Sequence, residues 1–501
     1  MPNTLFDDLI GRHAENDATF LHLPDGRTIS YRGFVALSGR FATALAGFGV
    51  RPGDRVAVQI DKGPEALALY AACVRAGLVF LPLNTAYTAE EIAYFVTDSA
   101  AGLFVCDPSR EDEMAAIARG ANAVLATLSG AGTGTLADAA AASAETFRTV
   151  DRTGEDLAAF LYTSGTTGRS KGAMLSHDNL LSNARTLADV WRFTAADTLL
   201  HALPIFHTHG LFVATNVTLV AGGAMIFLPK FDVDAMLSHM PRATAIMGVP
   251  TVYTRLLDDD RFTAEATGHM RLFISGSAPM LADTHRAFTE RTGHRILERY
   301  GMTETNMNTS NPYDGDRRPG TVGPPLPGVE LRIMDGERPV AQGQTGIIEV
   351  RGPNVFKGYW NMPEKTAEEL RADGWFITGD LGTQSADGYV TIVGRSKDLI
   401  ISGGFNIYPK ELELLLDDQP GVLESAVIGV PHPDFGETPV AILVAKPGAT
   451  PDLDAIRITM KSGLARYKHP ARIEILAELP RNTMGKVQKN VLRDRYRGMF
   501  T

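Results

Sequence analysis

The chain has 501 residues, and its 48 lysines and arginines against 58 aspartates and glutamates give a formal net charge of −10. At roughly 100 to 200 residues per domain, this length predicts more than one folding unit. A hydrophobic content of 44% with 21% charged residues excludes an intrinsically disordered chain. The acidic balance disfavours nonspecific binding of nucleic acid, because neutralising phosphates needs clustered lysine and arginine.

Cys73 and Cys106 are too few for a disulfide framework or a cysteine-only zinc site, so we expect small buried side chains in a reducing compartment. The first eight residues carry acid where a secretory signal carries base. No apolar run reaches the roughly 18 residues that span a membrane. We therefore expect a cytoplasmic protein without a membrane partner.

The first half of the chain alternates short apolar runs with helical patterns. An apolar run at residues 55–60, a helical pattern at 64–76 and a second apolar run at 78–83 predict a strand–helix–strand unit of a parallel sheet. We predict a large α/β body with parallel sheets and covering helices. Further apolar runs that end in polar or Gly/Pro turns lie at 158–162, 198–204, 224–228, 245–249 and 271–275.

Glycine and proline become frequent after Gly320, and alternating runs at 346–350 and 388–393 predict half-exposed strands. These patterns divide the chain into an N-terminal unit, residues 1–396, with a β-rich subdomain at about 320–396, and a small α+β C-terminal unit, residues 397–501. In the C-terminal unit, strands are predicted at 399–401 and 425–430 and helices at 409–416 and 453–464. Residues 457–501 hold 11 basic and 3 acidic side chains, a local excess that suits phosphate ligands.

A run of small hydroxyl residues and glycines follows one predicted strand directly: Thr163-Ser164-Gly165-Thr166-Thr167-Gly168-Arg169-Ser170-Lys171-Gly172. Such a loop can wrap polyphosphate oxygens with backbone N–H groups, whereas the simpler interpretation is a solvated turn. It is not a Walker A loop, because Ser170 precedes Lys171 and no hydroxyl residue follows it.

Residues 168–172 also fit G-x-S-x-G, the nucleophile elbow of hydrolases, with Ser170 as the nucleophile. An elbow needs a sharp turn from a strand into a helix. Here an apolar segment at 173–175 comes before the next helical pattern, so the hydrolase hypothesis is the less favoured one.

Five segments in this order resemble the motifs of the acyl-adenylate-forming superfamily, which comprises acyl-CoA synthetases, adenylation domains and luciferases. The segments are Thr163 to Lys171, Tyr300 to Glu304, Thr378 to Asp380, Gly394 to Asp398 and Pro480 to Lys486. The resemblance runs through nearly the whole chain. It implies a large N-terminal body with a mobile C-terminal lid, and a hinge at Lys397 about which the lid rotates between two half-reactions.

The same resemblance implies that ATP binds at these motifs. Tyr300 would offer a flat face to adenine, Asp380 would accept hydrogen bonds from the ribose, and Arg395 would reach the ribose or a phosphate. Alone, these side chains are typical of a core tyrosine, a turn and a surface ion pair. The implied ATP-binding set is Thr163, Ser164, Gly165, Thr166, Thr167, Gly168, Lys171, Gly276, Ser277, Ala278, Glu298, Tyr300, Gly301, Met302, Thr303, Asp380, Arg395 and Lys486.

Three residues are implied as catalytic: Lys486, Glu304 and His207. Lys486 would bridge the substrate carboxylate and the α-phosphate, although an isolated lysine in a Gly-flanked stretch is by default solvated. Glu304, with the hydroxyl of Thr163, would hold Mg²⁺, a hard cation that favours carboxylate and phosphate oxygens. After rotation of the lid, Ser402, Gly403 and Gly404 would line the passage for CoA.

The segments expected to form the acyl pocket are polar, which disfavours a fatty-acid tunnel. Arg255 follows Gly-Val-Pro-Thr in the first turns of a predicted helix, where it can either meet a second substrate carboxylate or face solvent. Four segments, 201–210, 274–279, 298–316 and 480–489, look like those of malonyl-CoA synthetases. That resemblance assigns Arg255 to the distal carboxylate and places Thr208 and Met307 at the C2 substituent. Further expected substrate contacts are His209, Ser275 and Arg286.

We therefore expect an ATP-dependent malonyl-CoA synthetase, with malonate or methylmalonate, ATP and CoA as its small-molecule partners and Mg²⁺ as cofactor. A synthetase for another short carboxylic acid is the alternative within this class. A serine hydrolase using Ser170 and a noncatalytic nucleotide sensor are alternatives from other classes. Lys486, Glu304 and Lys171 together argue against the sensor.

Overall fold

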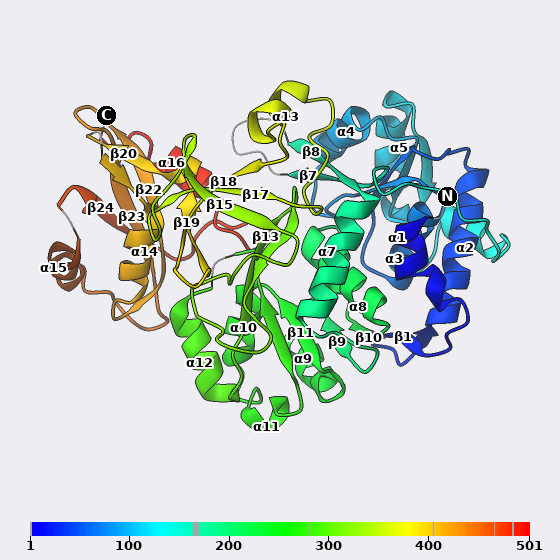
Figure 1. Cartoon of the computed structure of the whole chain (residues 1–501), viewed down its shortest axis with the longest axis horizontal. Helices are drawn as coiled ribbons and strands as arrows, with labels where there is room; N and C mark the ends of the chain where they lie inside the picture. The colour runs from blue at the N-terminus through cyan, green and yellow to red at the C-terminus, as the bar shows by residue number, and fades with distance from the viewer. Residues whose placement is uncertain are drawn as a thin grey trace.

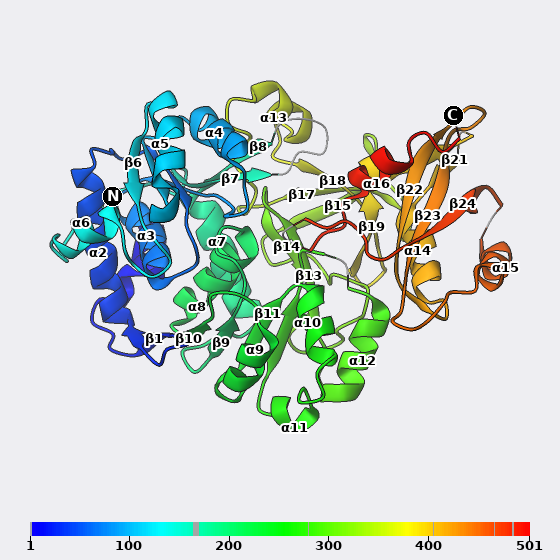
Figure 2. The same cartoon turned by 180° about the vertical axis from the view of Figure 1, so that it is seen from behind.

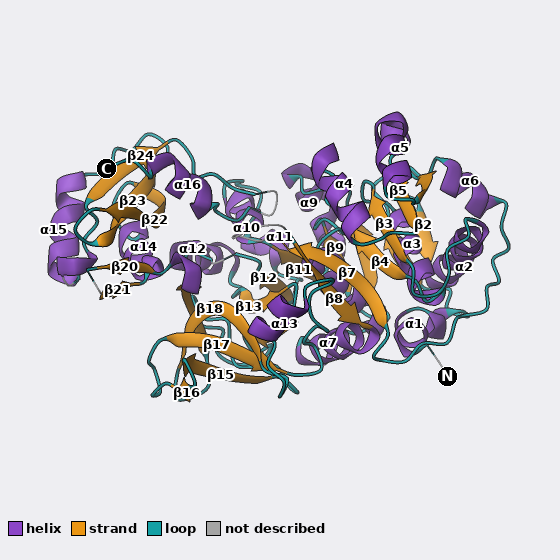
Figure 3. Cartoon of the chain, turned by 90° about the horizontal axis from the view of Figure 1, so that it is seen from above, coloured by secondary structure: helices purple, strands orange, loops and turns teal. Residues whose placement is uncertain are grey.

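The computed structural model describes residues 3–163, 170–278, 280–403, 405–464, 466–482 and 485–500. Within them, two sheets built mainly of parallel strands form the body, an antiparallel sheet adjoins them, and a fourth sheet belongs to the C-terminal unit (Figure 1). Seen from above, the C-terminal unit occupies one end of the molecule and the N-terminal strands and helices the other (Figure 3).

The first sheet is parallel except for its last strand. Helix α3, Pro64–Arg75, connects two of its strands and is apolar around nearly its whole circumference, so it is buried. The last two strands form an antiparallel hairpin in which Thr163 and Lys171 are register partners. In spatial order the strands are β6 (Val124–Thr127), β5 (Leu103–Cys106), β3 (Arg55–Gln59), β4 (Val79–Pro82), β7 (Leu157–Thr163) and β8 (Lys171–Ser176).

The second sheet has a parallel centre and an antiparallel strand at each edge. Helix α7, His177–Val190, contacts strands of both sheets and thus links them. The spatial order is β14 (Asn306–Ser310), β13 (Leu297–Met302), β12 (Leu272–Ser275), β11 (Ala245–Gly248), β9 (Thr198–His201), β10 (Ala224–Phe227), β1 (Thr19–His22) and β2 (Thr28–Ser30).

The third sheet is antiparallel throughout and corresponds to the predicted β-rich subdomain. Its buried carboxylate Glu349 accepts hydrogen bonds from Arg332, at 2.7 and 2.9 Å, and from Arg371, at 2.7 Å. The strands, in spatial order, are β16 (Arg338–Pro339), β15 (Glu330–Asp335), β17 (Gly346–Arg351), β18 (Phe376–Gln384) and β19 (Val390–Arg395).

The C-terminal unit contains a sheet covered by helices. Between the third sheet and this one lies η5, Ser396–Asp398, which holds the predicted hinge residue Lys397. The strands are β21 (Phe405–Ile407), β20 (Ile400–Ser402), β23 (Gly436–Ala445) and β22 (Val422–His432), with β24 (Arg472–Leu476) parallel to β23. Its helices are α14 (Pro409–Asp417), α15 (Leu453–Gly463) and α16 (Lys489–Tyr496), with η6 (Arg466–Lys468).

The remaining helices cover the sheets or connect their strands. They are α1 (Thr4–Leu9), α2 (Tyr31–Gly47), α4 (Ala89–Asp98), α5 (Glu111–Gly120), α6 (Thr135–Ala141), α8 (Asn216–Ala221), α9 (Val233–His239), α10 (Pro250–Leu257), α11 (Ala264–Thr267), α12 (Ala282–Thr292) and α13 (Pro363–Glu369). Shorter turns of helix are η1 (Gly11–His13), η2 (Pro108–Arg110) and η4 (Met240–Arg242), and η3 (His209–Thr215) is a π-helix.

The predicted α/β fold class is confirmed, with parallel sheets, a β-rich sheet and a separate C-terminal unit. Every apolar run named above contains or overlaps a strand of the structure. None of the helices in the described part of the chain combines the length and apolar character that crossing a membrane requires. The exact division at residues 396 and 397 stays a prediction.

Removing Glu349 should destabilise the third sheet, because Arg332 and Arg371 would lose their shared counter-ion. We expect Glu349→Ala to lower the free energy of unfolding by about 3 kcal/mol. Glu330→Ala, in the same sheet, removes the exposed partner of Arg351 and should cost less than about 1 kcal/mol. Urea unfolding followed by circular dichroism measures both; equal losses in the two variants would contradict the expectation.

Candidate active site

Polar residues gather in the second sheet where strands β11 and β12 end beside β13. Gly248 and Ser275, the last residues of β11 and β12, pair with each other, and Ser275 also pairs with Glu298, from which β13 runs on to Met302. The carboxyl ends of parallel strands are where ligands bind in open α/β sheets. Ser277, which follows β12, and Arg299, the residue after Glu298 on β13, therefore lie in one common region.

Arg299 is a buried cation in this region, with 3% of its surface exposed. Its Nε and Nη2 atoms have no hydrogen-bond partner among the described residues. A Cβ atom on Gly276 would lie 2.4 Å from its Cζ, so a glycine is needed for the guanidinium to fit here. Burial lowers the pKa of Arg299 to about 9, which still leaves it charged at neutral pH. Sequence reasoning did not single out Arg299, although its position directly before Tyr300 of the predicted nucleotide motif was a usable signal.

His207 and His209 lie against Arg299 at the start of the π-helix η3. Burial, followed by the charges of Arg299 and Lys486, lowers the pKa of His207 to about 4, so its ring is neutral at pH 7. The backbone N–H of His209 donates to Nδ1 of His207 at 3.3 Å, which places the ring proton on Nε2. Ser277, at φ +72°, holds its Oγ 3.2 Å from Nδ1 of His209.

Several buried polar atoms of this region lack a hydrogen-bond partner within the described chain. Buried polar groups are nearly always paired, so such a cluster indicates a polar ligand. An apolar tail would leave these groups unpaired. The atoms are Thr208 Oγ1, His209 Nε2, Ser275 Oγ, Arg299 Nε and Nη2, and both side-chain polar atoms of Asn306.

The predicted nucleotide residues Tyr300, Asp380 and Arg395 form one connected group. The hydroxyl of Tyr300 donates to Oδ2 of Asp380 at 2.6 Å, and Nε of Arg395 lies 2.6 Å from Oδ1 of the same carboxylate. Asp380 is buried and its backbone N–H donates to Thr378. The Thr-Gly-Asp segment on β18 and the hinge-side arginine on β19 are thus joined by antiparallel pairing.

Glu304 lies buried in the turn between β13 and β14, where Tyr359 donates a hydrogen bond to its Oε1 at 3.0 Å. Burial raises the pKa of Glu304 above its ordinary value. Thr163 ends β7, and Lys171 begins β8. The predicted phosphate-loop residues Ser164, Gly165, Thr166, Thr167 and Gly168 lie outside the described residues.

Lys486 comes from the C-terminal unit, whose chain before α16 crosses to the N-terminal body (Figure 2) and lies against α10. Its backbone N–H donates to Asn482 at 2.9 Å, and a Cβ atom on Gly485 would lie 3.7 Å from Thr251 Oγ1. Burial, followed by the charge of Arg395, lowers the pKa of Lys486. Three carboxylates act in the opposite direction: Asp380, Asp398 and Glu304. The structure therefore brings Lys486 together with the predicted nucleotide residues.

A cavity of about 370 Å³ lies between the two units. Arg255, Thr251 and Val249 line it from the N-terminal body, and Arg481 and Gly485 line it from the C-terminal unit. Arg255 is exposed on α10, with its guanidinium 5.9 Å from the ring of Phe231. It borders a ligand-sized space but is not buried as Arg299 is.

Of the other residues predicted to contact ligands, some lie close to Tyr300 and Ser277, and Arg286 is exposed. Met307 is buried on β14, where its Cε would lie 2.5 Å from a Cβ on Gly301, and Met302 adjoins the Tyr300 hydroxyl. Thr303 continues this turn, and Ala278 follows Ser277. Arg286 is exposed on α12 and pairs with Asp283, so its position gives no support to a substrate contact.

The predicted CoA-binding segment lies within the C-terminal unit. Ser402 ends β20 and is buried, Gly403 has φ +58° in the following turn, and Gly404 lies outside the described residues. Strand β20 pairs with β21 and β23 of its own sheet. A rotation of the unit would be needed to bring this turn to the site described above.

The hydrolase alternative finds no support in the backbone. Ser170 is followed by strand β8 and not by a helix, and Tyr94 donates to its carbonyl oxygen at 2.9 Å. Strands β7 and β8 thus pair antiparallel, whereas a nucleophile elbow is a strand–turn–helix.

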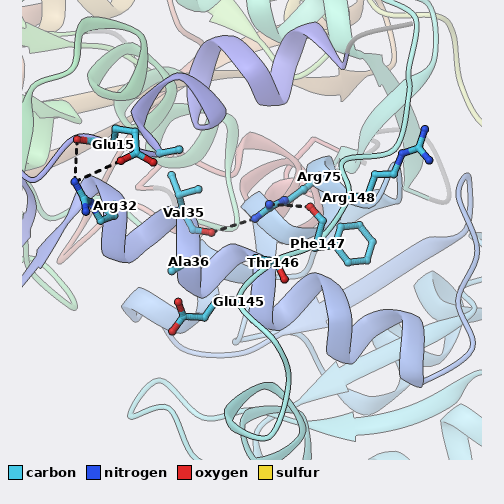
Figure 4. A pocket seen from close by; sticks show the side chains of 10 residues that line it. Glu15, Arg32, Val35, Ala36, Arg75, Glu145, Thr146, Phe147 and Arg148 are labelled. Atoms are coloured by element: carbon cyan, nitrogen blue, oxygen red, sulfur yellow. Dashed lines mark hydrogen bonds and ion pairs between the residues drawn. The ribbon is translucent and has the colours of Figure 1, made fainter.

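A larger cavity, of about 620 Å³, lies in the N-terminal half around α2. Arg75 and Phe147 meet there: Nη2 of the arginine donates to the backbone carbonyl of Phe147 at 2.8 Å (Figure 4). Arg32 and Glu15 lie on its rim. None of the site residues predicted from the sequence lines this cavity, so its size does not identify the active site.

Comparison with known proteins agrees with this arrangement. The family model described as AMP-binding enzyme matches residues 10–360, and the AMP-binding enzyme C-terminal domain matches residues 411–486. The chain belongs to the AMP-binding enzyme family. A feruloyl-CoA synthase from Amycolatopsis sp is 37% identical over 477 residues, 94% of each chain, and a malonate–CoA ligase from Arabidopsis thaliana is 36% identical over 488 residues, 91% of this chain and 80% of that one. This AMP-binding enzyme is an acid–thiol ligase of the acyl-CoA synthetase type.

Solved structures extend the comparison to the arrangement of the two units. ATP-bound MatB from Rhodopseudomonas palustris is 59% identical, covers 100% of both chains and superposes with a TM-score of 0.98. Apo MatB from the same organism, with the same identity and coverage, superposes with a TM-score of 0.87. The AMP-binding enzyme described here therefore has the overall arrangement of the ATP-bound neighbour.

The stability of the folded protein should depend on pH through the titration of Glu298. Burial raises its pKa to about 8, from an ordinary 4.5, so between these values the folded chain holds a proton that the unfolded chain has released. The stabilisation that the protonated Glu298 side chain provides is therefore complete below pH 4.5 and is lost as the pH rises toward 8. Glu298→Gln should therefore gain melting temperature relative to the parent between pH 5 and pH 9. Exposed Glu290→Gln is the control; a pH-independent difference for Glu298→Gln would contradict the expectation.

Proposed function

We propose that this AMP-binding enzyme is an ATP-dependent malonyl-CoA synthetase, with methylmalonate as a second candidate substrate. The observation that carries the proposal is Arg299, a buried guanidinium without a carboxylate partner among the described residues, beside His207 and His209. A monocarboxylic acid with an apolar tail would leave this cation uncompensated. A short dicarboxylic acid supplies one carboxylate for reaction and a second for the arginine. Likeness to a malonate–CoA ligase and to MatB supports the same substrate class.

The reaction consists of two displacements. A carboxylate oxygen of malonate attacks the α-phosphorus of ATP, pyrophosphate leaves, and malonyl-AMP forms. The thiolate of CoA then attacks the acyl carbonyl carbon, AMP leaves, and the thioester forms. The ammonium group of Lys486 supplies positive charge where negative charge develops in the first displacement. His207, neutral at pH 7, can donate its Nε2–H without adding charge.

The site also fits Mg²⁺. Glu304 is a buried carboxylate that accepts hydrogen bonds from Tyr359 and from its own backbone N–H, and Thr163 offers a hydroxyl at the end of β7. Within the described residues, no three His, Cys, Asp or Glu side chains gather in a metal-binding arrangement. One carboxylate and one hydroxyl, completed by phosphate oxygens and water, match the way Mg²⁺ is usually held. When bound, the ion would neutralise part of the phosphate charge.

The proposal includes rotation of the C-terminal unit about Lys397. In the present arrangement Lys486 faces the nucleotide residues, while Ser402 and Gly403 lie elsewhere on the same unit. The two TM-scores against MatB indicate that a close neighbour is found in more than one arrangement. A rotation that moves Lys486 away and brings the Ser402–Gly403 turn to its place would convert the adenylating site into the thioester-forming one.

Substitution of the two candidate arginines should separate their roles. Arg299→Met leaves a second substrate carboxylate unpaired, at a cost of about 3 kcal/mol or more, so malonate turnover should fall at least about 100-fold. Acetate turnover should change less than about threefold. ATP- and CoA-dependent AMP release measures this with acetate, malonate, methylmalonate, succinate and a fatty acid.

Arg255→Ala in the same assay distinguishes the two positions. If Arg255 holds the distal carboxylate, as the sequence resemblance implies, this variant alone loses dicarboxylate turnover selectively. Equal falls for acetate and malonate in both variants would contradict a dicarboxylate substrate. Arg299→Lys, which retains the charge, and a melting curve for each variant control for misfolding.

Loss of Lys486 should separate the half-reactions. We expect Lys486→Ala to lower adenylation roughly 10² to 10³-fold, because one electrostatic contact to the transition state is removed. Supplied malonyl-AMP should still react with CoA at nearly the parent rate. Lys461→Ala, on exposed α15, is the control. If thioester formation fell as far as adenylation, the role given to Lys486 would be wrong.

A further inference from the structure

Glu369 ends helix α13 and binds the ammonium group of Lys171 with both carboxylate oxygens, each 3.1 Å from Nζ. Both side chains are about one-fifth exposed, so this pair is more sheltered than a surface ion pair. The partners are 198 residues apart in sequence. Lys365, one turn earlier on α13, adds a second cation 2.9 Å from Oε1.

Tyr359 connects this pair to Glu304. The ammonium group of Lys171 lies 4.1 Å from the centre of the Tyr359 ring, within the range of a cation–π contact. The Tyr359 hydroxyl is 2.6 Å from Oε2 of Glu369 and 3.0 Å from Oε1 of Glu304. A phenol has one proton, so it can donate to only one of these carboxylates at a time.

The backbone fixes these side chains relative to each other. The segment 357–360 runs along the free edge of β8, where Lys357 N–H donates to Met174 and Trp360 N–H donates to Gly172, both at 2.8 Å. Met174 N–H in turn donates to the carbonyl of Gly358 at 3.0 Å. Lys171, on β8, and Tyr359, on this segment, therefore share one hydrogen-bonded frame, and α13 follows directly.

We infer that Glu369 and Tyr359 are positioning residues for the polyphosphate of ATP. An ammonium group has three N–H donors, and Glu369 engages two of them. The third donor remains for an anion at the end of the loop that Thr163 and Lys171 delimit. Through Tyr359, the same pair holds Glu304, the carboxylate that fits Mg²⁺. This inference rests on the proposed binding of ATP but not on the identity of the acyl substrate.

If Lys171 and Glu369 formed a purely structural ion pair, weakening it would not separate the affinity for ATP from the affinity for AMP. Lys171 can reach the β- and γ-phosphates only if the nucleotide has them, so its position should matter for ATP and not for AMP. Glu369→Gln replaces one acceptor oxygen with an amide N–H₂, which repels the ammonium donors. We expect ATP affinity to fall about tenfold and AMP affinity to change less than about twofold.

Isothermal titration of the full-length protein with ATP and with AMP, both in EDTA, tests this directly without turnover. Glu368→Gln is the matched control, because Glu368 is the neighbouring residue of α13, is exposed and pairs with Lys365 alone. Both affinities should stay within about twofold of the parent in this control. Unchanged ATP affinity in Glu369→Gln, or equal falls for ATP and AMP, would overturn the inference.

A second variant keeps the test informative if Glu369→Gln folds poorly. Tyr359→Phe retains the ring beneath Lys171 and removes the hydroxyl; it should raise the KM for MgATP about threefold to fivefold with kcat within about twofold. Combined with Glu369→Gln, its effect should be smaller than the product of the two single effects, because both act through one contact. Independent, multiplicative effects would overturn the inference. If the parent protein bound no ATP, the proposed function would fail instead.

Discussion

The uncompensated charge of Arg299 is the constraint on which the acyl side of the site depends. A buried guanidinium without an anion costs several kcal/mol, so its surroundings must hold it in place. Gly276 leaves room for it, and Tyr253 and Ile274, close by, belong to the buried core around the ends of the strands. The charge of Arg299 also helps to keep His207 and His209 neutral, after burial itself. The negative partner that this cation needs is left for a ligand to supply.

The nucleotide side differs, because its buried carboxylate Asp380 is already paired. Asp380 has one carboxylate oxygen on Arg395 and the other on Tyr300. Lys486 is the point at which the two sides meet, since its charge lowers the pKa of His207 and the charge of Asp380 raises the pKa of Lys486 itself. It arrives from the C-terminal unit, so under the proposed function the acyl and nucleotide sides would form a complete site only when that unit is docked as it is here.

The sequence was sufficient for features that depend on local pattern. Strands such as β3 and β12 are short apolar runs bounded by turn residues, and β7 ends at Thr163, where the glycine-rich run begins. Side-chain direction was harder to predict: Arg255 and Arg286 both lie on helices near the site, and the packing of α10 and α12 leaves both exposed. The pairing of Lys171 with Glu369 could not be read from either segment, because it arises when the chain after Gly358 adds to the edge of β8.

The antiparallel register of Thr163 and Lys171 has an entropic consequence. The chain leaves the sheet at one of these residues and returns at the other, so folding of the hairpin has already brought the two ends of the loop together. The cost of closing a loop grows with the logarithm of its length and is normally met by whatever holds its ends. Here the pairing of β7 with β8 offsets that cost in the protein without nucleotide. The free energy of phosphate binding is then not reduced by the entropic cost of bringing the loop ends together.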